Sequence, residues 1–225
     1  MQGAYRQLRS RIIKVSLVVA ALLWCNIGHG QVLVLDATGR PIMPKEYVNL
    51  KGSPYLYDDW VKGTVRLANG IEYKDIYLMY DQVKEELNFT YKDGKVQKFV
   101  DPVAQFTLED RKFRRDLIGE NNSLVDGFYE VLVDGEIKLL KRSSKRIVDE
   151  LTHAVATKER RIQEVTSQYL LIKGELVKVK DNKNAVIKAL GTHKAALEAY
   201  IQKENLKMKD EQDMVKLITY FNSLN

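Results

Sequence analysis

The stretch Thr64-Val65-Arg66-Leu67-Ala68-Asn69-Gly70-Ile71-Glu72-Tyr73 decides the fold class of this chain. Arg66 and Glu72 alternate with apolar neighbours, as expected for two strands that are each buried on one face. Between the strands stands Asn69-Gly70, and an Asn-Gly pair between alternating runs is the strongest local signal for a tight β-hairpin. We therefore expect an antiparallel β-sheet to begin in this region.

The same signal recurs along the next 70 residues, with Asp-Gly in place of Asn-Gly. Seven or more strands at this spacing favour an antiparallel sheet that curls or packs on itself as a sandwich. The further hairpins are Leu87–Val100 around Asp93-Gly94 and Phe128–Leu140 around Asp134-Gly135, and the single strands are Ile76–Tyr80 and Val103–Leu108.

Toward the C-terminus the composition shifts to Ala, Leu, Lys and Glu without Pro, which favours helices. Asn184–Leu190 predicts a short helix that ends at Gly191, and Thr192 is the expected N-cap of a second helix over Lys194–Ile201. Asp210 is expected to be the N-cap or the first residue of a last helix. The apolar residues fall on one face of each of these two helices: Ala196, Leu197, Tyr200 and Ile201 in the second, and Met214, Leu217, Ile218, Phe221 and Leu224 in the last.

The charged segment Ser143–Ser167 lies between the sheet and the helices and lacks a clean period. We interpret its stretch Ile147–Val155 as one short helix or a loop, followed by a last hairpin over Tyr169–Val179. The fold class is thus α+β. The expected organisation is a signal peptide at 1–30, an antiparallel β domain at 31–145, a connecting segment with a β-hairpin at 146–180 and an α-helical C-terminal segment at 181–225.

The first thirty residues have the three parts of a secretory signal peptide. Four basic residues and no acidic one accompany the apolar run Val15–Cys25, and the small residues Gly28 and Gly30 provide a cleavage site. An uncleaved anchor fits less well, because the run is shorter than the ~20 residues that span a bilayer. Lipidation at Cys25 fits less well because bulky Trp24 precedes it.

Cleavage after Gly30 changes the charge of the chain from 36 basic against 30 acidic residues to 32 against 30, and it removes the sole Cys. We expect an exported protein, periplasmic, cell-surface or secreted, with no membrane span after cleavage. Nucleic acid is not an expected partner of such a nearly balanced chain. We interpret the densest basic cluster as a solvated strand end; it comprises Lys138, Lys141, Arg142, Lys145 and Arg146.

Few groups in the sequence suit catalysis. His153 and His193 lie in different predicted elements, and no HExxH, GxSxG or P-loop motif is present. We expect no metal site, no cofactor and no enzymatic activity. A catalytic pair of carboxylates is defined by the distance between its members in space, which the sequence does not give. Paired aspartates in a loop are usually turn residues. The candidate carboxylates are Asp58, Asp59, Asp75 and Asp81.

The aromatic residues are concentrated in one part of the chain, since seven of the twelve tyrosines lie between Tyr47 and Tyr91. Tyrosine rings on strands usually pack into the hydrophobic core. Tyr55, Tyr57 and Trp60 flank paired aspartates in a predicted loop, where binding residues tend to lie. We take these three as candidate ligand-binding residues.

Three motifs give the chain a family resemblance. Gly52–Trp60 leading into Gly63-Thr64-Val65, then Gly127–Gly135, and then Tyr220-Phe221-Asn222 are similar to parts of exported proteins of unknown function found in Bacteroidota. The resemblance implies an envelope or secreted location and carries no catalytic residues. The leading expectation is an exported, non-enzymatic structural or interaction protein of the bacterial envelope, with an envelope protein or a glycan as partner. The alternative is a carbohydrate-binding or carbohydrate-active domain that uses the aromatic loop.

Overall fold

The computed structural model describes residues 47–90, 95–115, 117, 127–151, 158–179, 182–208 and 210–224. The predicted signal peptide at 1–30, the Asp93-Gly94 turn and His153 lie outside these residues. Within the described residues, no helix is both long and apolar enough to cross a membrane.

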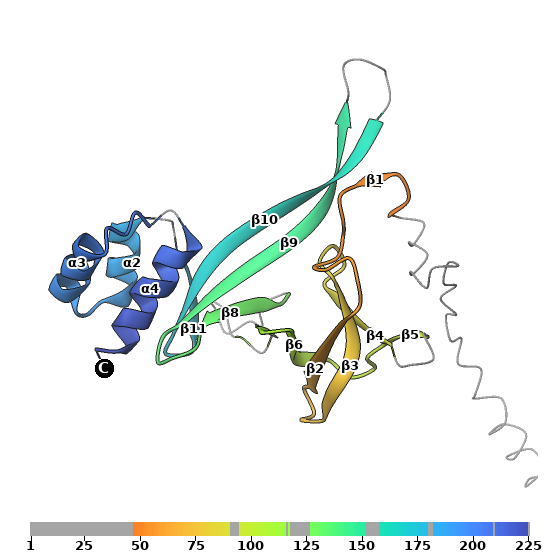
Figure 1. Ribbon diagram of the computed structural model, residues 1–225, viewed down its shortest axis with the longest axis horizontal. Helices are drawn as coiled ribbons and strands as arrows, with labels where there is room; N and C mark the ends of the chain where they lie inside the picture. Colours follow the sequence, from red (N-terminus) through yellow and green to blue (C-terminus); the bar gives the residue numbers. More distant parts are fainter. Residues whose placement is uncertain are drawn as a thin grey trace, which may run out of the picture. The chain divides into compact units, whose positions relative to one another are not determined.

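One open sheet holds all eleven strands of the described residues, in the order β1-β10-β9-β8-β7-β6-β2-β3-β4-β5, with β11 also paired to β10 (Figure 1). All pairings are antiparallel except that of β1 with β10. This sheet followed by C-terminal helices confirms the predicted α+β class. The strands are β1 (Leu50–Lys51), β2 (Val61–Leu67), β3 (Glu72–Asp81), β4 (Glu86–Thr90), β5 (Val96–Lys98), β6 (Val103–Leu108), β7 (Arg111–Arg114), β8 (Tyr129–Val133), β9 (Lys138–Leu151), β10 (Lys158–Ile172) and β11 (Glu175–Val179), and the helices are α2 (Lys183–Leu190), α3 (Lys194–Lys203) and α4 (Glu211–Asn222).

The predicted hairpins are confirmed by the strand register. In the first, Arg66 lies opposite Glu72, and Gly70 turns the chain with a φ of 89° that favours glycine. β4 and β5 pair through Thr90 and Val96. β8 and β9 pair around the Asp134-Gly135 turn with one register shift, and β10 and β11 form the predicted last hairpin.

The interpretation of Ile147–Val155 as a helix or loop is wrong where the structure describes it. β9 and β10 pair without a register shift from Lys138 opposite Leu171 to Leu151 opposite Lys158. Polar and charged residues lie on both faces of this ribbon, so the sequence shows no period-two alternation of hydrophobicity. The strands are matched instead by cross-strand partners, such as Ile147 opposite Ile162. The expected boundary at residue 145 therefore falls inside β9.

The first helix begins at Lys183, one residue before the predicted start, and ends at Leu190 as the sequence predicts. The side chain of Asn182 accepts a hydrogen bond from the Ala185 N–H at 2.8 Å, and Gly191 ends α2 with a φ of 75°. The prediction of Thr192 as the next cap is wrong. His193 occupies the N-cap of α3 in the left-handed conformation, with no side-chain capping hydrogen bond.

The helices pack their apolar faces against one end of the sheet. α4 contacts β8 and β9, and α2 contacts β11. The side-chain amide of Asn222 accepts from the Ile137 N–H at 3.0 Å and donates to the Ile137 carbonyl at 2.9 Å, which fixes the end of α4 to the β8–β9 turn. The helical core includes Leu139, Leu170, Val179, Val186, Leu197, Met214, Leu217, Ile218 and Phe221, and a separate aromatic core includes Val65, Leu78, Tyr80, Phe106, Phe113 and Phe128.

Candidate functional site

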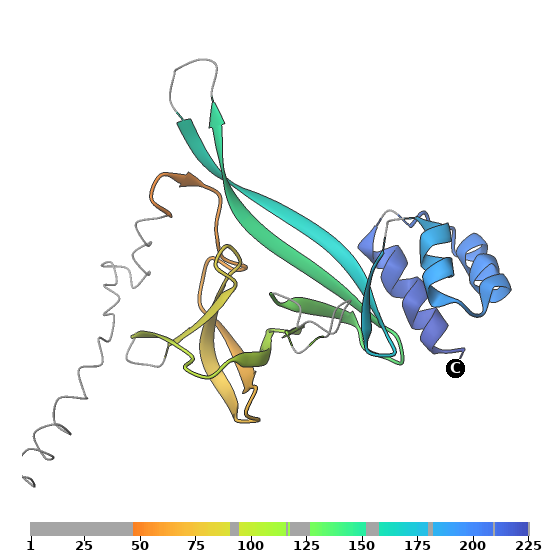
Figure 2. The ribbon, with the colours of Figure 1, turned by 180° about the vertical axis from the view of Figure 1, so that it is seen from behind.

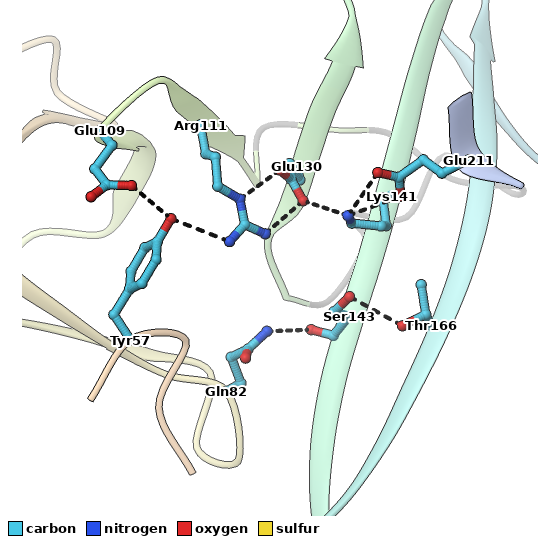
Figure 3. Close-up of polar contacts among 9 residues, drawn as sticks. All are labelled: Tyr57, Gln82, Glu109, Arg111, Glu130, Lys141, Ser143, Thr166 and Glu211. Atoms are coloured by element: carbon cyan, nitrogen blue, oxygen red, sulfur yellow. Dashed lines mark hydrogen bonds and ion pairs between the residues drawn. The ribbon is translucent and has the colours of Figure 1, made fainter. Parts of the chain in front are cut away.

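A chain of buried ion pairs joins the sheet to the helices (Figure 3). Arg111 of β7 donates from Nε to Glu130 Oε1 at 2.7 Å and from Nη2 to Oε2 at 2.9 Å. Lys141 of β9 lies 3.1 Å from Glu130 and 2.9 Å from Glu211, at the start of α4. The side chains of Glu130 and Lys141 are 8% and 17% exposed, whereas that of Glu211 is 41% exposed, so the network is buried at its centre and reaches solvent at its helical end. We call these four residues the charge network.

The strand register dictates this network. Glu130 of β8 lies between Phe113 of β7 and Lys141 of β9, so the three side chains share one face of the sheet. Arg111 is two residues before Phe113 and therefore lies on the same face. A carboxylate on this face of the sheet needs cationic partners, and the neighbouring strands provide them.

The ion pairs move the pKa values of their members. Burial would raise the pKa of Glu130, but the hydrogen bonds and charges of Arg111 and Lys141 outweigh it, and the pKa is lowered. Burial would lower the pKa of Lys141, but Glu211 and Glu130 raise it. Both groups are therefore held in their charged forms.

Tyr57, one of the candidate ligand-binding residues, lies at the end of the charge network. Its hydroxyl accepts a hydrogen bond from Arg111 Nη1 at 3.4 Å and donates to Glu109 Oε2 at 3.3 Å (Figure 3). The Arg111 guanidinium also lies 5.8 Å from the Tyr57 ring centroid. The half-buried Tyr57 side chain thus has partners within the fold at both its ring and its hydroxyl.

The other two candidate residues lie in the same loop between β1 and β2. The Tyr55 ring packs edge-on against Tyr47, with centroids 6.1 Å apart, and the Tyr55 carbonyl accepts from Lys145 Nζ at 2.5 Å. Trp60 is half-buried and directly precedes β2. Tyr55 and Tyr57 therefore contact different parts of the sheet.

The candidate carboxylates differ in their surroundings. Asp81 is 2% exposed, and it accepts from the Tyr47 hydroxyl at 2.6 Å and from two backbone N–H groups of the following turn at 2.9 Å. Asp58, Asp59 and Asp75 are exposed. Asp81 therefore serves the turn after β3, which is the ordinary role of an aspartate at such a position.

A second polar cluster surrounds Glu85 and was missed by the sequence analysis. The Tyr80 hydroxyl donates to the Glu85 carboxylate, Arg142 lies 3.3 Å from it, and Arg115 Nη2 donates to the Glu85 carbonyl at 2.9 Å. The Arg115 guanidinium also lies 4.0 Å from the centroid of the Phe128 ring. Burial, followed by the charge of Glu85, raises the pKa of Tyr80.

The interpretation of the basic cluster as a solvated strand end is wrong. Its first four members are half-buried, and each has an acidic or carbonyl partner; only Arg146 is exposed. The partners come from distant segments, which the sequence could not pair. One local signal was available, since Glu130 stands alone among the apolar residues of Phe128–Val133 and such a carboxylate requires a cation. The partners are Asp134 for Lys138, Glu130 and Glu211 for Lys141, Glu85 for Arg142, the Tyr55 carbonyl for Lys145 and Gln163 for Arg146.

The β9–β10 ribbon extends beyond β8, and we call this part the distal ribbon (Arg142–Leu151 and Lys158–Ser167; Figure 2). β8 pairs with β9 only as far as Lys141. Beyond it, Gln82 accepts from the Lys145 N–H at 3.1 Å and donates from its side chain to the Ser143 carbonyl at 3.2 Å (Figure 3).

The two faces of the distal ribbon differ in what contacts them. Gly52 lies so close to one face that a Cβ there would be 3.2 Å from the Cβ of Ile162. Lys145 shares this face, because it lies opposite Glu164, two residues from Ile162, although Glu164 and Thr166 on it are exposed. Val165 points to the opposite face and is 45% exposed. Both faces therefore carry exposed side chains, and we call the face that carries Val165 the open face.

No family model, no curated protein and no solved structure matches this chain. Across the described residues, no group of three or more His, Cys, Asp or Glu side chains is arranged to hold a metal ion. His193 is exposed at the start of α3, with its ring 5.8 Å from that of Phe221.

Proposed function

We propose that this chain is an exported, non-enzymatic interaction protein of the bacterial envelope, and that the open face of the distal ribbon contacts its protein partner. The observation that carries the proposal is the extension of the β9–β10 ribbon beyond β8. Ten residues of β9 extend past the last residue that β8 pairs, with β10 as their strand neighbour. A two-stranded ribbon is marginal in water by itself, so its extension is better explained by a contact than by core formation.

The polar residues nearest the candidate loop support a binding role over a catalytic one. Glu130 and Asp81 are buried and satisfied by partners within the fold, and Tyr57 is held between Arg111 and Glu109. A catalytic acid or base has to reach a substrate proton, and these groups are committed to structural contacts. Tyr55 likewise packs on Tyr47, which favours the interaction protein over the carbohydrate-binding alternative.

Export is proposed from the sequence. The basic start, the short apolar run and the small residues before Gln31 form the pattern of a cleaved signal peptide. Mass spectrometry of the N-terminus of the protein recovered from the source bacterium tests this part. We expect Gln31 as the first residue, and an intact Met1 in the recovered protein contradicts cleavage.

A crosslinking pull-down from envelope fractions tests the binding role. Residues 31–225 serve as bait, beside the variants Val165→Asp and Ile71→Asp, which place the same charge at two similarly exposed positions, 45% and 49%. We expect the wild type and Ile71→Asp to recover the same partner and Val165→Asp to lose it. Recovery of nothing above background, or equal recovery by both variants, contradicts the proposal.

A further inference from the structure

The outer edge of β10 contains a gap. On one side β9 pairs with β10 along its length. On the other side β1 pairs only with Arg160 and Arg161, and β11 pairs only with Gln168–Ile172. Within the described residues, Ile162–Ser167 thus has no strand on that side. At ~3.3 Å per residue, this edge gap is about 20 Å long.

The edge gap has few of the features that usually protect an exposed strand edge. Such edges are blunted by charged side chains, above all Lys, by Pro or by a bulge. Ile162–Ser167 contains neither Pro nor Lys, its register with β9 has no shift, and Glu164 is its one charged residue. Alternate residues of an antiparallel strand direct both their N–H and their C=O to the same side, so half of these residues offer hydrogen bonds to an added strand.

The flanking strands exclude a second copy of β10 from this gap. If two copies paired antiparallel about Val165, the partner's β10 would continue opposite Arg160 and Arg161. β1 already occupies that position. The gap therefore fits a short segment of about six residues whose two ends leave the sheet.

The side chains of the gap specify the chemistry of this segment. On the face that carries Lys145, the exposed Glu164 stands between Ile162 and Thr166. Lys145 lies opposite Glu164 on β9 and donates to the Tyr55 carbonyl. On the other face stands Val165, 45% exposed. An added strand gains a charge pair from a basic side chain beside Glu164 and an apolar contact from a β-branched side chain beside Val165.

We propose that the edge gap binds an extended peptide segment of a protein partner by strand addition, with Lys or Arg beside Glu164 and a β-branched apolar residue beside Val165. This proposal rests on the proposed function, because it names the part of the distal ribbon that the partner occupies. The main-chain hydrogen bonds supply affinity, and the two side chains supply selectivity.

Hydrogen exchange with two synthetic peptides tests the proposal. The probes are the capped hexapeptides Thr-Val-Lys-Val-Thr-Ser and Thr-Val-Glu-Val-Thr-Ser, each added at about 1 mM to residues 31–225. We expect the Lys peptide to slow exchange of the open-edge amides within Ile162–Ser167 by about tenfold. By fluorescence polarisation, we expect it to bind about threefold more tightly than the Glu peptide.

Two variants with the same change of charge locate the interaction. Glu164→Lys is expected to reverse the preference between the peptides, while Glu175→Lys, at an exposed position of β11 outside the gap, is expected to preserve it. Unchanged exchange in Ile162–Ser167 with either peptide overturns the proposal, and so does a preference that both variants leave unaltered. If the pull-down recovers a partner that leaves these amides unprotected, the proposed function stands and this inference fails.

Discussion

Replacement of Glu130 by Gln removes the central charge of the charge network while nearly preserving the shape of the side chain. In the wild type, this carboxylate receives two hydrogen bonds from Arg111, at 2.7 and 2.9 Å, and an ion pair from Lys141 at 3.1 Å. After the substitution, two cations face a neutral amide. We expect the free energy of unfolding to fall.

The size of this loss follows from the partners that remain. Breaking a buried ion pair costs ~3–5 kcal/mol when the other charge is left with no partner. Here Lys141 keeps Glu211 at 2.9 Å, and Arg111 keeps the Tyr57 hydroxyl and is 28% exposed. We therefore expect a loss of about 2 kcal/mol, within the range for hydrogen bonds to charged groups.

Urea unfolding followed by circular dichroism at pH 7 measures the loss, with Glu109→Gln as the matched control. Glu109 is an exposed carboxylate that accepts a hydrogen bond from the Tyr57 hydroxyl. Its neutralisation should therefore lower the free energy of unfolding by less than about 0.5 kcal/mol. If Glu130→Gln and Glu109→Gln unfold at the same urea concentration, the buried network contributes no more than a surface contact and the reasoning is refuted.

The pH dependence gives an independent check on Glu130. Because its pKa is lowered in the folded state, its ionisation stabilises the fold above its unfolded pKa of about 4.3. That contribution is lost as pH falls through the folded value. The difference in unfolding free energy between the wild type and Glu130→Gln should therefore be constant near neutrality and shrink below about pH 4. A difference that stays constant down to pH 3 would contradict the ionic origin.

Three further substitutions test the contacts that hold the sheet and helices. Asp81→Asn should lower the unfolding free energy by about 2 kcal/mol in a urea titration, because an NH2 group replaces Oδ2, the acceptor for Tyr47, and the neutral Oδ1 accepts more weakly from two backbone N–H groups. Gly63→Ala should cost at least about 2 kcal/mol, seen as a lower melting temperature, since its Cβ would lie 2.0 Å from the Thr107 carbonyl oxygen. Asn222→Ala should cost about 1 kcal/mol and speed amide exchange in α4, and unchanged exchange there would show that the side-chain clamp is dispensable.

The parts of the fold that the sequence predicted are those specified locally. Asn69-Gly70 and Asp134-Gly135 fix hairpins through the turn, and Gly191 ends α2 through its own backbone conformation. The distal ribbon was missed because its strands carry polar residues on both faces, so its pattern lacks the alternation that burial on one face imposes. Its pairing is specified across the chain, by residues such as Ile147 and Ile162.

The polar clusters could be predicted only in part, because their members come from separate strands. Glu130 falls within a predicted hairpin, and its partners Arg111 and Lys141 lie 19 and 11 positions away on other strands. Lys141 was noticed for its charge, but burial and register decide whether such a lysine is solvated or paired. Burial and register are known only once β7, β8 and β9 are paired in the sheet.

The contacts that stabilise the distal ribbon also explain why its edge is open. β8 stops at Lys141, and beyond it the ribbon is held by Gln82 at the β9 edge, by the short β1 at one end of the β10 edge, and by the Lys145 contact with the Tyr55 carbonyl. Within the described residues, none of these contacts places a strand beside the edge gap, so its outward backbone groups have no strand neighbour. An open edge without Pro, Lys or a bulge is an aggregation hazard unless something covers it. Strand addition at the edge gap, as proposed above, would cover this edge and pair its outward backbone groups.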